Sequence, residues 1–259
     1  MQDSYSPLQV ILRRDRLIVV ASLTIIIALS WAYILTGAGI DSDSGRMSAV
    51  MLARPSWNAG YALLMAFMWW VMMLAMMLPS ATPMILLFTA VNAKSEDGSR
   101  LAGAAFVIGY ALAWAGFSAA ATTLQWGLEM GGLLTSAMAS SSLLLGGGLL
   151  VAAGVWQLTP LKHACLRHCR SPLHFLSHGW REGADGALRM GLEHGAFCLG
   201  CCWVLMTILF YGGAMNLWWI AGLAFYVLIE KLVPAGHRIG RGLGVLLIVW
   251  GLFVIAAAP

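Results

Sequence analysis

Long apolar runs separated by short polar segments dominate this chain. Seven such runs lie at about 17–36, 60–88, 101–123, 141–160, 194–213, 217–233 and 242–258, and the last two are the shortest. A helix of about 20 apolar residues crosses the ~30 Å hydrocarbon core of a bilayer. We therefore predict an all-α fold, a polytopic transmembrane helix bundle of about seven spans.

Composition supports a membrane protein and excludes an ordinary soluble domain. The 259 residues are 60% hydrophobic and only 10% charged, whereas soluble domains carry about 25% charged residues. The lipid bilayer is therefore the expected surrounding. The net charge of +4 gives no reason to expect nucleic acid as a partner, because the position of the charges along the chain is what matters.

The basic residues predict the orientation. With the N-terminus in the cytoplasm, 13 of the 15 Lys and Arg residues fall on the cytoplasmic side, and only Arg46 and Arg54 fall outside. Such a bias is typical of the positive-inside rule. We predict a multi-pass protein of the bacterial inner membrane with its C-terminus outside.

We expect a single integral membrane domain, 1–259. Residues 1–58 form an N-terminal anchor span and an outer loop, and residues 59–259 form the core. The run at 17–36 is longer than the apolar region of a signal peptide and no small-residue cleavage site stands out, so it is interpreted as an uncleaved span. Glycines of the fourth run and before the seventh predict close helix packing: Gly146, Gly147, Gly148, Gly154, Gly240, Gly242 and Gly244.

The second run is longer than one span needs. A helix of its 29 residues would reach ~43 Å. Pro79 and Pro83 each remove a backbone donor, so the sequence LPSATP is the expected position of a break. The break would form a polar notch that contains Ser80 and Thr82; the alternative is an ordinary proline kink.

All five cysteines lie within residues 165–202. The predicted topology places them on the cytoplasmic side, where disulfides are rare. Residues three or four apart share a helix face, so the pair Cys165 and Cys169 and the group Cys198, Cys201 and Cys202 could converge on one ion. His168 and His194 lie beside the two groups and make a mixed thiolate–imidazole site conceivable. The alternative is that the thiols are small buried hydrophobes.

Two further kinds of candidate ligand occur. Met72 and Met76 belong to a stripe with Met65 and Met68, and thioethers suit Cu(I), although methionine is also a common packing residue. Glu230 is an acid inside a late apolar run and thus a functional candidate. Its alternatives are snorkelling to the interface or pairing with Lys162.

Four stretches together resemble a bacterial family of predicted metal-binding integral membrane proteins, sometimes labelled copper chaperones. They are WWVMMLAMMLPSATP (69–83), WQLTPLKHACLRHCRSP (156–172), GALRMGLEHGAFCLGCCWVLM (186–206) and IEKLVPAG (229–236). The resemblance extends from about residue 60 onward. It implies a polytopic helical protein with a metal site at the five cysteines and Glu230.

The first functional hypothesis is the binding, delivery or transfer of Cu(I) through cytoplasmic-leaflet cysteines. The alternative is a membrane subunit of an oxidoreductase that uses the cysteines for copper or an iron–sulfur cluster, and the third is a structural zinc site. No catalytic residues are identified, and neither a haem attachment motif nor a nucleotide-binding loop is present. The expected partners are the metal ion and a small soluble metal-handling or redox protein.

Overall fold

The computed structural model describes residues 7–36, 57–95, 100–135 and 137–258. Within these ranges the chain is helical and contains no strand, which confirms the all-α prediction. Arg46, Arg54 and most of the predicted outer loop lie outside the described residues. The helices are α1 (Pro7–Leu35), α3 (Ala59–Asn92), α4 (Arg100–Met130), α5 (Leu143–Leu158), α6 (Pro160–Arg170), α7 (Pro172–Gly179), α8 (Gly183–Thr207), α9 (Leu209–Gly212), α10 (Leu217–Leu232) and α11 (Gly236–Ala256).

Five segments of the described chain are long and apolar enough to cross a membrane: α1, α3, α4, the continuous α8–α9 segment and α11. The number rises to six if α5 and α6, which are bent by 65° at a short break, form one span. The predicted count of seven also needs α10, which has only 16 residues. The number of spans and the positions of the termini therefore stay predictions.

Helix α3 corrects the predicted break at LPSATP, because it runs unbroken for 34 residues with Pro79 and Pro83 inside it. Hydroxyl groups bond to neighbouring carbonyls of the helix: Ser80 Oγ donates to Met77 O at 2.8 Å and Thr82 Oγ1 to Leu78 O at 2.9 Å.

Helix α8 begins 11 residues earlier than the predicted span at 194–213. The residues before 194 lie outside the predicted span, but two glycines near its start, Gly191 and Gly195, are packing positions against α4. A Cβ on Gly191 would lie 2.0 Å from Phe106 O of α4, and one on Gly195 would lie 2.6 Å from Ala113 Cβ. The cysteines at 198–202 thus lie in the second half of a long helix, not in its first turns.

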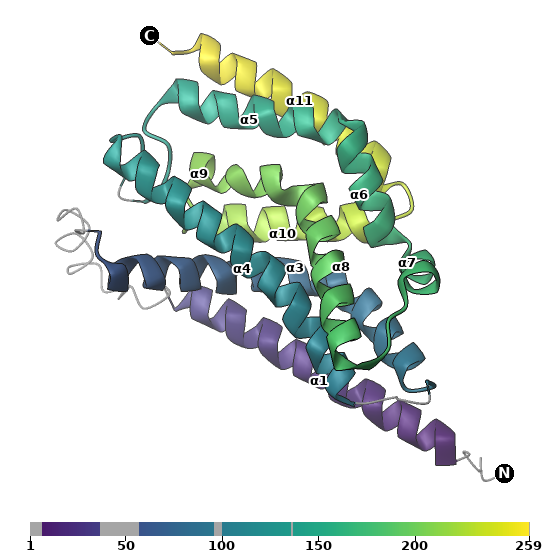
Figure 1. Ribbon diagram of the computed structural model, residues 1–259. Helices are drawn as coiled ribbons and strands as arrows, with labels where there is room; N and C mark the ends of the chain where they lie inside the picture. The colour runs from purple at the N-terminus through teal and green to yellow at the C-terminus, as the bar shows by residue number, and fades with distance from the viewer. Residues whose placement is uncertain (1–6, 37–56, 96–99, 136, 259) are drawn as a thin grey trace.

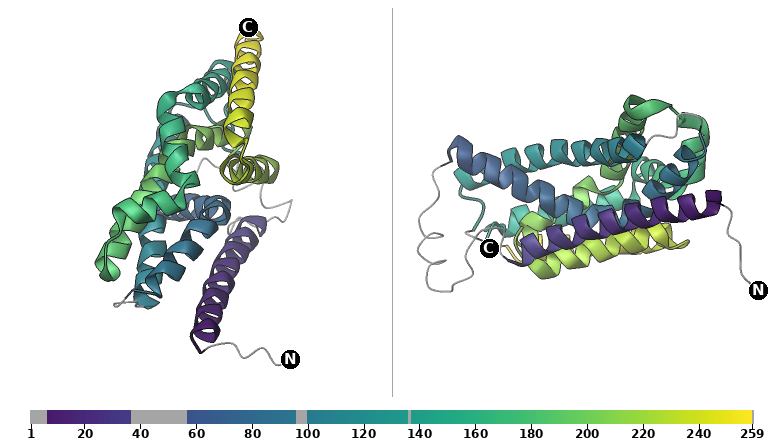
Figure 2. Two further views of the ribbon diagram at one scale, coloured as in Figure 1. Left: turned by 90° about the vertical axis from the view of Figure 1, so that its right-hand side faces the viewer. Right: turned by 90° about the horizontal axis from the view of Figure 1, so that it is seen from below.

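The helices form two closely packed pairs joined by α6 and α10. Helices α5 and α11 run side by side, α4 packs along α8, and α3 lies between α1, α4 and α10 (Figure 1). Figure 2 shows α1 along the edge of the bundle, where its neighbour is α3. Helix α6 turns away from α5 and covers α8, which brings segments distant in sequence together at the centre.

Glycines let α5 and α11 approach closely, as predicted for Gly147, Gly154 and Gly244. A Cβ on Gly147 would lie 2.7 Å from Gly251 O, and one on Gly154 would lie 2.5 Å from Gly244 O. Gly148 and Gly242 do not take part, because added Cβ atoms there would meet nothing within 4 Å.

We expect Gly154→Ala to lower the free energy of unfolding by about 1–3 kcal/mol, because the added methyl group overlaps backbone atoms of α11. Gly148→Ala, on the open face of the same helix, is the matched control. It should be neutral or stabilise by up to about 1 kcal/mol through helix propensity. Thermal unfolding of the purified variants measures both. Equal effects of the two changes would contradict close packing of α5 and α11 at Gly154.

Candidate functional site

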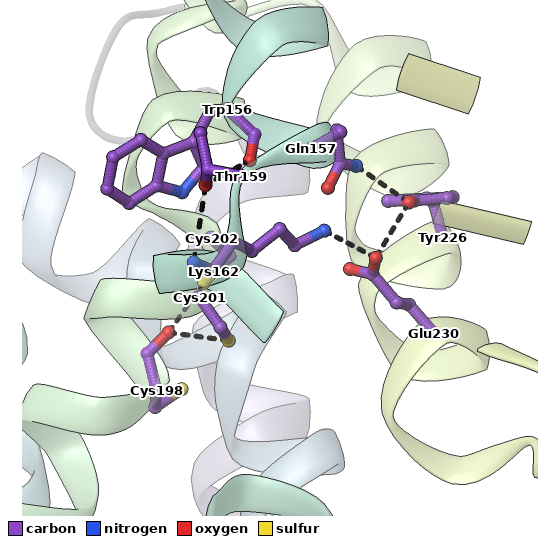
Figure 3. Close-up of polar contacts among 9 residues, drawn as sticks. All are labelled: Trp156, Gln157, Thr159, Lys162, Cys198, Cys201, Cys202, Tyr226 and Glu230. Atoms are coloured by element: carbon purple, nitrogen blue, oxygen red, sulfur yellow. Dashed lines mark hydrogen bonds and ion pairs between the residues drawn. The ribbon is translucent and has the colours of Figure 1, made fainter. Parts of the chain in front are cut away.

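Three thiols of α8 are buried, and the partly buried thiol of Cys169 in α6 adjoins them. Cys198, Cys201 and Cys202 are at most 1% exposed. The thiols of Cys201 and Cys202 each donate to the carbonyl of Cys198 at 3.0 Å, as Figure 3 shows. The Cys202 thiol lies against that of Cys198, and the Cys201 thiol lies against both Cys202 and Cys169. Two sequence-distant cysteine groups are therefore neighbours in space, as predicted.

Cys198 lies in a polar environment. Lys231 Nζ of α10 donates to Cys198 Sγ at 2.9 Å and to Ser80 Oγ of α3 at 3.3 Å. Tyr110 Oη of α4 lies 3.1 Å from Cys198 Sγ and 3.3 Å from Met77 O. A buried ammonium at this distance stabilises a thiolate. Ser80 therefore has a polar contact with another helix, as expected for the predicted notch, but no break of α3 forms it, and Thr82 bonds within its own helix.

A thioether completes the sulfur cluster. Met77 Sδ of α3 lies 3.9 Å from Cys202 Sγ, and both side chains are buried. Thiolate and thioether sulfurs are the soft donors that select Cu(I). The donor set of Cys198, Cys202 and Met77 therefore fits this ion better than a hard cation.

A buried ion pair lies beside the cluster and ties α6 to α10. Lys162 Nζ bonds to Glu230 Oε1, and the two side chains are 0% and 2% exposed. Tyr226 Oη donates to the same oxygen at 3.1 Å, and Gln157 Nε2 donates to Tyr226 Oη at 2.7 Å (Figure 3). The structure thus confirms the pairing of Glu230 with Lys162.

The bend between α5 and α6 positions these groups. Thr159 is the N-cap of α6 and accepts a bond from Lys162 N, and Pro160 occupies the first turn. Both features are typical helix starts. The 65° bend points Lys162 towards α10 and sets Cys165 and Cys169 over α8. A Cβ on Gly200 would lie only 2.8 Å from Cys165 Sγ.

The other predicted ligands have aromatic or apolar neighbours, and His194 lies one helical turn before Cys198. The ring of His168 stacks on Phe197 at 4.2 Å and bonds to Ala164 O within its own helix. His194 is buried between aromatic rings, and its Nδ1 has no partner among the described atoms. Met72 and Met76 are 1% exposed core residues of α3, which is compatible with a ligand role and with packing.

Lys231 and Tyr110 were not identified from the sequence. Lys231 is a cation inside an apolar run, and the same reasoning that selected Glu230 could have found it. Tyr110 carries no such signal. Among the described residues, no three His, Cys, Asp or Glu side chains are arranged to hold a metal ion. A site here therefore depends on few ligands and on methionine.

Fold and site together define a helix bundle with a buried, charge-compensated sulfur cluster. The family model PpoB2, described as a copper chaperone, matches residues 66–254. The chain therefore belongs to the PpoB2 copper chaperone family, which supports a copper-related function and confirms the resemblance seen in the sequence. Comparisons with curated proteins and with solved structures give no match.

Proposed function

We propose that this protein is an integral membrane copper chaperone that binds Cu(I) at the sulfur cluster of α3, α6 and α8. The observation that carries the proposal is the convergence of Cys198, Cys202 and Met77 in a buried site, with Cys201 and Cys169 adjoining. Cu(I) is satisfied by about two or three soft ligands, which the thiols of the cluster and Met77 supply together.

The charges of the site support a monovalent soft cation. Lys231 can balance a thiolate at Cys198, to which its ammonium donates, and Glu230 is paired with Lys162, so the charges of the site balance without a metal ion. When Cu(I) binds, a second thiol can lose its proton and compensate the added charge. Glu230 then acts through its ion pair and not as a ligand.

The buried methionines of α3 offer a path for the ion. Met68, Met72 and Met76 are at most 3% exposed, and thioethers bind Cu(I) weakly enough to release it. We propose that the ion leaves or reaches the cysteines along this stripe. A small soluble metal-handling protein at the cytoplasmic face of the bacterial inner membrane is the proposed exchange partner.

Anaerobic titration of the purified protein with Cu(I) against a chromophoric chelator tests the function. Wild type should bind Cu(I), and Cys198→Ser should remove most of it. Met72→Leu and Met76→Leu, which keep the side-chain volume, should weaken binding only modestly. A protein that binds no Cu(I), or that is coloured by an iron–sulfur cluster, would contradict the proposal; zinc in place of copper would support a structural site.

The proposed topology has a separate test. A reporter fused after Pro259 should be active on the outer side of the membrane, because seven spans from a cytoplasmic N-terminus end outside. Activity in the cytoplasm alone would contradict the seven-span count, in which α10 is the shortest span.

A further inference from the structure

A second group of sulfurs lies near the other end of the methionine stripe. Met65 of α3 and Met138, in the connection between α4 and α5, are 3% and 6% exposed. Their sulfurs lie 3.7 and 3.5 Å from the same atom, Nε2 of Gln125 in α4. Two thioethers from segments 73 residues apart thus converge on one buried point.

The surrounding bonds fix this arrangement. Trp69 Nε1 donates to Gln125 Oε1 at 2.8 Å, so the amide nitrogen is the atom that faces the sulfurs. One N–H of that nitrogen bonds to Glu129 Oε1 at 2.8 Å. The other has only the two thioethers, which are weak acceptors. The amide therefore holds the sulfurs in place but is poorly satisfied by them.

Met138, one of the two converging methionines, has an unusual backbone conformation. Its φ is 54°, and no other non-glycine residue in the described part of the chain has a positive φ. Met138 N donates to Thr135 O at 2.9 Å, and Ser140 N donates to Phe210 O, so the turn is anchored on both sides. Methionine has no special tolerance for this conformation, and the strain indicates a positional requirement.

The carboxyl group of Glu129 lies beside the sulfurs. Glu129 accepts bonds from Trp57 Nε1 at 2.8 Å and from Gln125, and no cationic side chain of the described ranges forms an ion pair with it. A half-buried carboxylate in such surroundings attracts positive charge. Soft neutral sulfurs and one compensating carboxylate together select a soft monovalent cation over a hard divalent one.

We propose that Met65 and Met138, with Glu129 as the compensating charge, form a second Cu(I) site. The inference rests on the proposed function and deepens it. Met65 lies 12 residues before Met77, or ~18 Å along the helix, with the buried methionines of the stripe between them. The protein then has a thiolate site near the centre and a weaker thioether site at one end of the same stripe.

Ag(I) titration of the protein with ¹³C-methyl methionine tests this site, because Ag(I) is a redox-inert soft analogue of Cu(I). In wild type, the methyl signals of Met65 and Met138 should shift together, after the cysteines are filled. The signal of Met84, a buried methionine of the same helix without a polar contact to its sulfur in the structure, is the internal control. Met65→Leu with Met138→Leu should bind one equivalent less, and Met84→Leu should match wild type.

The outcomes separate the two proposals. If Ag(I) fills the cysteines while the signals of Met65 and Met138 stay unchanged, the second site is wrong and the proposed function stands. If the protein binds no Ag(I) at all, the proposed function fails and the second site fails with it. Because the signals are read in wild type, misfolding of a variant cannot hide either result.

Discussion

Cys169→Ser and Cys201→Ser are each expected to remove most of the bound Cu(I), and the double variant should lose little more than either single one. The two thiols belong to different helices but lie against each other, and Cys201 also contacts Cys202 at the centre of the cluster. Residues that act in one site give non-additive changes, whereas independent sites give additive ones.

Anaerobic competition with a chelator gives the stoichiometry and affinity for this cycle. Met84→Leu, which alters a buried sulfur outside the cluster, is the control and should bind as wild type does. Loss of metal in two separate and additive steps would show that α6 and α8 carry independent sites. If both single variants keep all of the bound Cu(I), the two cysteines are packing residues and not ligands.

Glu230→Gln is expected to lower the free energy of unfolding by about 3–5 kcal/mol, because removing one partner of a buried ion pair leaves an uncompensated charge. Lys162 is fully buried in the structure, and its ammonium would have only a neutral amide opposite. Replacing both partners together, as Lys162→Met with Glu230→Leu, should restore much of the loss.

Thermal or chemical unfolding of the purified variants measures this effect. The exposed pair of Arg181 and Glu193, with N and O 2.7 Å apart and both side chains more than 40% exposed, is the matched control. Glu193→Gln should cost at most about 1 kcal/mol. The ion pair would not stabilise the contact of α6 with α10 if Glu230→Gln and Glu193→Gln lowered the free energy of unfolding equally. The same would follow if the double variant were as unstable as Glu230→Gln.

The sequence was sufficient to predict the long helices, which depend on local patterns, and the meeting of the two cysteine groups, which the predicted topology placed on one side of the membrane. Apolar length predicts a helix wherever it occurs, and three- and four-residue spacing places Cys198, Cys201 and Cys202 on neighbouring positions of one face. The pairing of Glu230 with Lys162 was also accessible, since a buried acid needs a partner.

What the sequence could not show depends on contacts between distant segments. The prolines of α3 predict a break, yet the helix stays continuous where it packs against α4 and α10. The residues before 194 lie outside the predicted span, but Gly191 is needed where α8 touches α4. The position of Met138 beside Met65 depends on a turn whose geometry has no sequence signature.

The pairing of α5 with α11 has a consequence for the order of assembly. Helix α6, which carries Cys169, continues from α5, and α5 packs along α11, which follows α8 in the chain. During synthesis, α8 and its three cysteines are therefore made before α5 has this packing partner. We expect the contact of α6 with α8 to become stable only after α11 has been added.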